Sequence, residues 1–171
     1  MNRAADGGSI RRVETGRTGI SLFLSHMPGR YGPLGAMLDE MALTGVDEVI
    51  SLAPLQEIRT KSPAYAELLD RGNLPWEFRV VPVEDFGVPE DPEAYAAEVG
   101  RAASLLLAGR RLLVHCGAGI GRTGTFALCV LAALGIPPGE ASQAVSAAGS
   151  GPETDGQAEL ASRFRERFPG G

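Results

Sequence analysis

The residues with the clearest capacity for chemistry are Cys116 and Arg122, which are joined by the glycine-rich segment 117–121. An apolar run at 111–115 precedes the thiol and an apolar segment at helical spacing follows the arginine, so the pattern predicts a strand, a tight turn and a helix. A helix N-terminus offers unpaired backbone N–H groups and the positive end of its dipole, which attract anions and stabilise a thiolate. We therefore hypothesise that this loop binds a phosphate group and that Cys116 attacks it.

Two other kinds of phosphate-binding loop resemble this segment only in part. The loop satisfies the G-x-G-x-x-G pattern of dinucleotide binding, but that fold needs a further strand and an acidic residue after the helix. Here the chain passes through Pro137 and Pro138 into another helical pattern instead. A nucleoside-triphosphate loop needs G-x-x-x-x-G-K-[ST], whereas Arg122 replaces the lysine and Cys116 replaces the first glycine. Both alternatives are therefore disfavoured.

A third kind of loop, in which five residues separate a cysteine from an arginine that precedes serine or threonine, fits in pattern and setting. The thiol ends a predicted strand, the glycines let backbone N–H groups approach a ligand, and a helix begins at the arginine. Cys129, in contrast, lies inside an apolar helical pattern, which is typical of a small buried side chain. The sequence therefore indicates cysteine-dependent phosphoryl transfer at Cys116.

The ten residues from His115 to Gly124, HCGAGIGRTG, resemble the signature loop of the cysteine-based protein tyrosine phosphatase superfamily. The chain length and the position of the loop in the last third resemble the small dual-specificity-type, atypical branch. Two earlier stretches, 27–30 and 45–52, loosely resemble the start of cyclin-dependent-kinase-inhibitor-3-like members. The resemblance covers residues 20–168 and implies a phosphatase.

In a phosphatase of this kind, Cys116 is the nucleophile that forms a phosphocysteine intermediate. Arg122 presents a planar fork to two phosphate oxygens, a geometry that lysine does not copy. Thr123 is expected to donate its hydroxyl to the sulfur, or else to bond the backbone of its own helix. His115 is expected to orient the loop from behind. Backbone N–H groups of the loop would surround the remaining oxygens; the substrate-binding residues are Gly117, Ala118, Gly119, Ile120, Gly121 and Arg122.

The leaving oxygen needs a proton, so a carboxylic acid should stand over the loop. Asp85 is the candidate, because its segment follows a predicted strand and should project from the same sheet edge as Cys116. Members of the resembled family carry a general-acid aspartate at about this spacing. An aspartate near a glycine is also common in turns, and Glu84 is the alternative acid.

Gln157 has two interpretations. The pattern Thr154-x-x-Gln157 resembles one in related phosphatases whose glutamine places the hydrolytic water. Threonine and glutamine at this spacing equally form a capping box at a helix N-terminus, which has no part in catalysis.

Strand and helix patterns alternate along the chain, which predicts an α/β domain. We expect a central mixed, largely parallel twisted sheet with helices on both faces, and the signature loop between the last strand and a helix. Residues 1–19 are interpreted as a flexible lead-in and residues 20–171 as a single phosphatase domain. The expected strands are 20–24, 46–52, 76–83 and 111–115, and the expected helices are 33–43, 64–69, 92–108, 123–134, 139–148 and 154–168.

Composition excludes several classes of partner. The chain has 171 residues, 44% of them apolar, and a net charge of −5, which gives no overall attraction to nucleic acid or anionic membranes. Two cysteines do not make a disulfide framework, and no apolar run has the length of a membrane span, so we expect a cytoplasmic protein. Lys61 is the only lysine, which we attribute to coding bias.

We expect no cofactor and no metal, since His26 and His115 lack ligand-type spacing. The expected partner is a phosphorylated protein or peptide, with phosphotyrosine ahead of phosphoserine and phosphothreonine. Because Ala118 and Ile120 add no positive charge to the loop, phosphoinositide and RNA 5′-phosphate substrates rank lower. A non-catalytic phosphate-binding module is the alternative outside enzymes.

Overall fold

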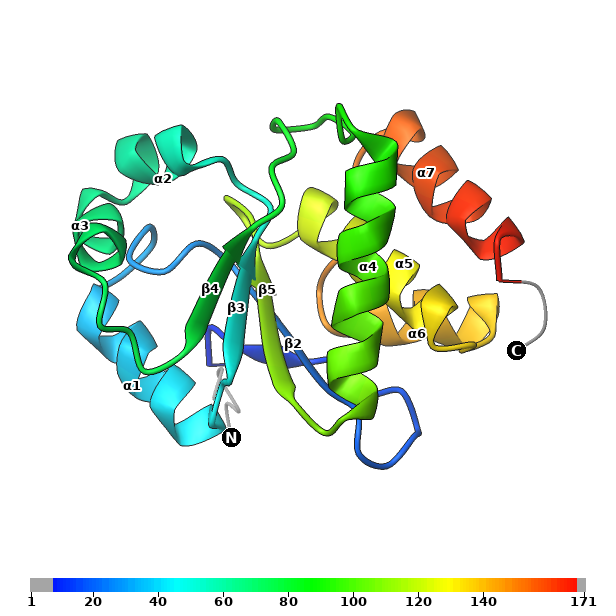
Figure 1. Ribbon diagram of the computed structural model, residues 1–171, viewed down its shortest axis with the longest axis horizontal. Coiled ribbons are helices and arrows are strands. Elements are labelled where there is room, and N and C mark those ends of the chain that lie inside the picture. The colour runs from blue at the N-terminus through cyan, green and yellow to red at the C-terminus, as the bar shows by residue number, and fades with distance from the viewer. Residues whose placement is uncertain (1–7, 169–171) are drawn as a thin grey trace, which may run out of the picture.

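The computed structural model describes residues 8–168. Five strands form one sheet in the order β1-β2-β5-β3-β4, in which β1 is antiparallel to β2 and every other neighbouring pair is parallel (Figure 1). The expected mixed, largely parallel sheet is thereby confirmed. The strands are β1 Arg11–Arg12, β2 Ser21–Ser25, β3 Glu48–Ser51, β4 Glu77–Val80 and β5 Arg111–His115.

Helices cover both faces of the sheet, as Figure 1 shows, so this part of the predicted fold class is also confirmed. Three helices pack on one face: α1 Leu34–Thr44, α2 Leu55–Lys61 and α3 Pro63–Arg71. Four lie on the other: α4 Pro92–Leu107, α5 Gly121–Ala133, α6 Pro138–Ala147 and α7 Asp155–Glu166.

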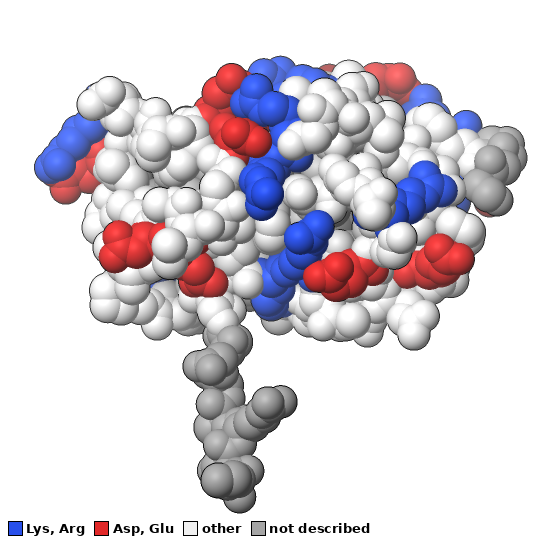
Figure 2. All heavy atoms as spheres, turned by 90° about the horizontal axis from the view of Figure 1, so that it is seen from below, with Lys and Arg blue, Asp and Glu red and all other residues white. Residues whose placement is uncertain are grey.

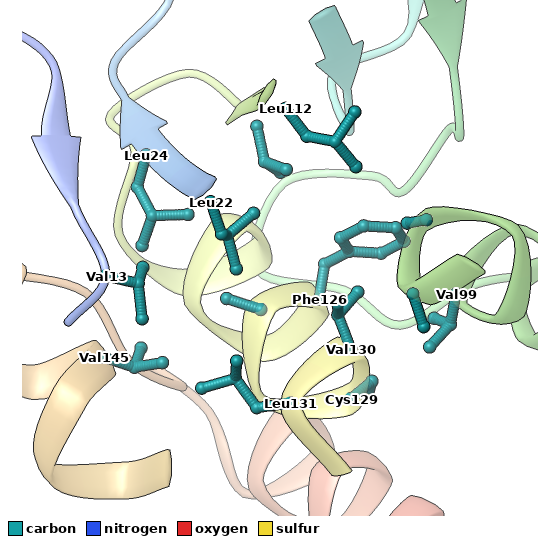
Figure 3. Close-up of a cluster of buried hydrophobic side chains, with 14 of the residues drawn as sticks. Val13, Leu22, Leu24, Val99, Leu112, Phe126, Cys129, Val130, Leu131 and Val145 are labelled. Atoms are coloured by element: carbon teal, nitrogen blue, oxygen red, sulfur yellow. The ribbon is translucent and has the colours of Figure 1, made fainter. Parts of the chain in front are cut away.

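Strand residues alternate between two hydrophobic clusters, because successive side chains of a strand point to opposite faces. In β5, Leu112 and Val114 join the cluster beneath α4–α7, whereas Leu113 joins the cluster beneath α1–α3. Figure 3 shows the first cluster, which contains Phe126 and Cys129 of α5 together with Leu22 and Leu112 of the sheet. The central strands are therefore buried on both sides, as their continuous apolar runs predicted.

The N-terminal segment differs from the expected flexible lead-in. Residues 1–7 lie outside the described residues, but Arg11–Arg12 forms β1 and pairs with Leu24 and Phe23 of β2. Val13 is buried in the core, where Figure 3 shows it near Leu22 and Val145. The prediction is thus wrong at residues 11–13, because a two-residue strand is too short to produce a periodic sequence signal.

Helix ends mostly follow their sequence signals. Gly45 ends α1 in the left-handed conformation, and the Asp91 side chain caps α4 by accepting a bond from the Ala94 N–H. The helix α2 was not expected, because it spans only seven residues and buries only Ile58. This omission matters for the site, since α2 supplies two of its charged groups.

The face at the amino ends of the strands carries a band of basic side chains with acidic groups beside it (Figure 2). Charges at these strand ends are paired: Arg110 lies 3.8 Å from Asp47 and 3.7 Å from Glu77. Basic and acidic groups therefore alternate on this face.

Candidate active site

The candidate site lies at the carboxyl edge of the sheet, where the segments that follow four parallel strands meet. This edge is where α/β sheets place ligands, because loops from neighbouring strands converge there. The four contributions are Arg30 after β2, Glu57 and Lys61 after β3, Asp85 after β4, and Cys116 to Arg122 after β5.

Most backbone carbonyls of the loop after β5 are bonded to the surrounding protein. The Cys116 carbonyl accepts from Nδ1 of His115 at 3.0 Å, and the Gly117 carbonyl accepts from the Met27 N–H at 3.1 Å. The Ile120 carbonyl accepts from the N–H groups of Gly124 and Gly151. Within residues 8–168, no protein acceptor takes the N–H groups of residues 117–120. A loop with carbonyls held and N–H groups free can receive an anion.

Two positions at the loop require glycine because backbone atoms from other segments approach them too closely for a Cβ. Gly119 has φ of 75°, and a Cβ there would lie 2.4 Å from the Ser25 carbonyl oxygen. A Cβ on Gly124 would lie 2.2 Å from the Gly151 nitrogen. The side chains of Ala118 and Ile120 are exposed, so the expected substrate-binding residues present backbone rather than side chains.

Arg122 lies in the first turn of α5 and is buried. Its Nη1 and Nη2 each donate to one carboxylate oxygen of Glu57 at 2.8 Å, and Nη1 also donates to the Val83 carbonyl at 2.8 Å. Burial works against the charge, but the bond to Glu57 and the nearby acidic groups raise the pKa of Arg122. The guanidinium is therefore fixed in place and charged.

Glu57 is the site residue that sequence reasoning missed. It lies on α2, and Lys61 one turn later donates to its Oε1 at 2.6 Å. Burial alone would raise the pKa of Glu57, but hydrogen bonds from Arg122 and Lys61 lower it to about 2. The signal that could have found the pair is the four-residue spacing of glutamate and lysine.

Asp85 reaches the same cluster from the segment after β4. Its Oδ1 lies 3.2 Å from Nη2 of Arg122, and its Oδ2 lies 3.6 Å from Nζ of Lys61. The side chain is 48% exposed, so it stands at the mouth of the site rather than inside the fold. Phe86, the next residue, has φ of 59°, which is rare for a bulky side chain. Glu84, the alternative acid, lines a groove between this segment and α4.

His115 and Thr123 are both buried, one on each side of the loop in sequence. The ring of His115 bridges the Cys116 carbonyl and the Tyr65 hydroxyl, which lies 3.0 Å from Nε2. Burial lowers the pKa of His115 to about 4, although the bond to the Cys116 carbonyl acts in the opposite direction. The Thr123 hydroxyl has no partner within residues 8–168, so neither expected hydrogen bond is formed.

Gln157 is buried at the start of α7, with both ends of its amide engaged. Its Oε1 accepts from the Glu153 N–H at 3.0 Å, and its Nε2 donates to the Gly87 carbonyl at 3.1 Å. Its own N–H donates to the Thr154 side chain, which caps the helix. The residue therefore ties α7 to the segment that carries Asp85.

Among residues 8–168, no group of three histidine, cysteine, aspartate or glutamate side chains could hold a metal ion. No helix in the same range combines the length and apolarity that crossing a bilayer requires. Both cysteines, Cys116 and Cys129, are buried and free.

A largely parallel α/β sheet with a cysteine-arginine loop between its central strand and a helix is the arrangement typical of the cysteine-based phosphatase class. The family model described as "Swiss Army Knife protein, DSP-PTPase phosphatase domain" matches residues 33–167. The chain belongs to this family of phosphatase domains, which confirms the resemblance found in the signature loop.

Solved structures of phosphatases have the same fold. Kinase associated phosphatase (KAP), with its catalytic-site cysteine replaced by serine, superposes with a TM-score of 0.76 at 20% identity, covering 93% of this chain and 94% of that chain. Tk-PTP in its active form gives 0.67 at 27% identity over 86% of this chain and 92% of that chain. PTPMT1 in complex with PI(5)P gives 0.69 at 20% identity over 94% of this chain and 97% of that chain.

Proposed function

We propose that the protein is a metal-independent phosphomonoesterase that removes phosphate from phosphotyrosine in proteins, and also from phosphoserine and phosphothreonine. The observation that carries this proposal is the meeting of three groups at one sheet edge. Cys116 and Arg122 share a loop with free N–H groups, and Asp85 lies 3.2 Å from the Arg122 guanidinium. A nucleophile, a charge clamp and a proton donor are thus supplied by the chain itself.

In the first step, the Cys116 thiolate attacks phosphorus and the bond from phosphorus to the leaving oxygen breaks. Asp85 gives its proton to that oxygen, while Arg122 and the loop N–H groups hold the charge on the phosphoryl oxygens. In the second step, water attacks the phosphocysteine and its proton passes to Asp85. The sulfur leaves as a thiolate, and the Thr123 hydroxyl, which has no partner within residues 8–168, would have to turn toward the sulfur to stabilise it. Inorganic phosphate is the product.

Glu57 contributes to this chemistry by position. Because both terminal nitrogens of Arg122 donate to Glu57, the guanidinium is held in one orientation. A preorganised donor costs no reorganisation when the phosphoryl group transfers.

A phosphoinositide is the second candidate substrate, favoured by one observation. A Cβ on Gly117 would lie 2.7 Å from Nη1 of Arg30, 3.0 Å from Oε1 of Glu57 and 3.2 Å from Nζ of Lys61, so two cations and one carboxylate flank the loop. These cations suit a ligand with a second anionic group, and PTPMT1, which has the same fold, was solved with PI(5)P. The uncharged side chains of Ala118 and Ile120 favour the protein substrate.

The test is hydrolysis of an aryl phosphate with a chelator present. We expect wild-type turnover to persist, Cys116→Ser to be inactive, and Asp85→Ala to lose roughly 10²–10⁴-fold in kcat. Glu84→Ala is the matched control and should retain activity. Unchanged turnover in Cys116→Ser would contradict the mechanism, and oxyanion binding without turnover would identify a non-catalytic module. Phosphopeptides compared with soluble phosphoinositides then decide the substrate class.

A further inference from the structure

The peptide between Gly119 and Ile120 is held by two side chains from distant parts of the chain. The Gly119 carbonyl accepts from Nη2 of Arg11 at 2.8 Å and from Oγ of Ser150 at 2.6 Å. Ser150 lies three residues after the end of α6, whereas Arg11 belongs to β1 at the edge of the sheet. Arg11 also lies outside the residues 33–167 that the family model matches.

The Arg11 side chain lies between the phosphate loop and the end of α6. Its Nη1 donates to the Ala148 carbonyl at 2.6 Å, at the end of α6. Gly149, with φ of 74°, leaves the space for it, because a Cβ there would lie 2.7 Å from Nη1. The guanidinium is thus bound by two backbone carbonyls, one of which belongs to the phosphate loop.

No acidic side chain among residues 8–168 forms an ion pair with Arg11, whereas Arg122 pairs with Glu57 and Asp85. Partial burial lowers the pKa of Arg11, and its electrostatic interaction with Cys116 acts in the opposite direction. A guanidinium that remains charged here leaves a positive charge close to the sulfur. That charge favours any anion bound in the loop.

Because the peptide unit is planar, binding the Gly119 carbonyl also fixes the direction of the Ile120 N–H. In a trans peptide, the C=O and the following N–H point in opposite directions. With the Gly119 carbonyl bound by Arg11 and Ser150, the Ile120 N–H points away from them and is free to donate to a ligand. A rotated peptide would instead present a carbonyl oxygen to the phosphate, which repels it.

We propose that Arg11 is a positioning residue that acts through the Gly119 carbonyl to keep the Ile120 N–H available to the substrate oxyanion. The proposal rests on the proposed function only in requiring the loop to bind an oxyanion. Ser150 shares this role from the other side of the carbonyl, and the N-terminal strand is therefore part of the working phosphatase.

The experiment measures the dissociation constant of tungstate, used as the oxyanion probe, for the full chain and its variants by calorimetry at a temperature where all are folded. Arg11→Gln should bind tungstate roughly 10- to 100-fold more weakly, as expected when a bond involving a charged group is lost. Arg11→Lys should recover part of the affinity because it restores the charge, and Ser150→Ala should weaken binding in the same direction.

Arg12→Gln is the matched control, because Arg12 is the next residue and its side chain pairs with exposed Glu14 at 3.7 Å. It should bind tungstate as the wild type does. A lower melting temperature for Arg11→Gln with an unchanged tungstate dissociation constant would assign Arg11 a merely structural role and overturn the proposal. If the wild type itself fails to bind tungstate, the proposed function fails as well, so the two failures are distinct.

Discussion

The carboxylate of Glu57 binds Arg122 in parallel, with each of its oxygens 2.8 Å from one terminal nitrogen of the guanidinium. This pair connects a short helix after β3 to the first turn of α5. Bidentate pairs of this kind define the orientation of the guanidinium as well as its charge. The direction in which Arg122 can meet a phosphate thus depends on α2.

Replacing Glu57 should therefore impair catalysis more than folding. We expect Glu57→Gln to lower kcat/KM on an aryl phosphate by roughly 10- to 100-fold, since it removes a charge-assisted bond to Arg122. Steady-state kinetics provide the measurement. Glu67→Gln, at an exposed position of α3, is the control and should retain wild-type kinetics. Equal kinetics for the two variants would mean that Arg122 is oriented without Glu57.

Lys61 should act through Asp85. Its ammonium lies 2.6 Å from Glu57 and 3.6 Å from Asp85, so its removal takes away one of the two cations that hold the Asp85 side chain at the site. We expect Lys61→Met to lower kcat/KM by roughly 3- to 10-fold, in line with the modest strength of partly exposed ion pairs. The double variant with Asp85→Ala should be no slower than Asp85→Ala alone. Additive losses would show that Lys61 acts independently of Asp85.

Stability should fall in mild acid because of His115. Burial lowers its pKa from 6.5 to about 4 in the folded protein, so the unfolded chain binds the proton first as the pH falls. Stability is therefore lost between pH 6.5 and 4 and regained as pH rises. From the shift, we expect urea unfolding to report a loss of about 2 kcal/mol between about pH 7 and 5.

The variant His115→Asn provides the comparison for this pH dependence. It lacks the titrating ring, so its free energy of unfolding should change less over the same interval. Parallel pH profiles for the wild type and the variant would exclude His115 as the source.

Cys129 should be inert in the folded protein. It is fully buried in the core, and burial raises its pKa to about 12. Mass spectrometry after iodoacetamide treatment at about pH 8 should find Cys129 unmodified until denaturant is added, since the thiolate is the reactive form. Rapid alkylation without denaturant would show that this part of the core opens.

Gln157→Ala should separate the two interpretations of that residue. Because both ends of the amide are bonded, to Glu153 and Gly87, we expect a loss of about 1–3 kcal/mol in the free energy of unfolding. In pre-steady-state kinetics on an aryl phosphate, this variant should show no burst of leaving-group release that the wild type lacks. A burst of leaving-group release would indicate slow hydrolysis of the phosphoenzyme, and would support a water-positioning role instead.

Much of the fold was predictable because its signals are local and repeated. The apolar runs of β3 and β5 identify buried strands, and the Asp91-Pro92 start of α4 has the expected cap. The pattern that joins Cys116 and Arg122 is local as well, because its spacing and glycines belong to one short segment. The family that this pattern suggested is confirmed by the family model, which matches residues 33–167.

Other parts of the site were not predictable because their roles depend on contacts that exist only in the folded protein. Glu57 and Lys61 form an ordinary glutamate-lysine pair in sequence, and only the sheet order brings them to Arg122. Arg11 lies in a segment without periodicity and meets the loop 108 residues later. A hydrogen bond between residues so far apart in the sequence leaves no local sequence pattern.

The position of Lys61 has a practical consequence for anyone who labels this protein. As the only lysine, it provides the only side-chain amine, and it lies beside Asp85 and Gly117. Acylating dyes, amine-reactive crosslinkers and covalent coupling to a sensor surface would therefore attach at the mouth of the phosphate loop or at the terminal amine. Immobilisation through a different chemistry keeps that mouth open.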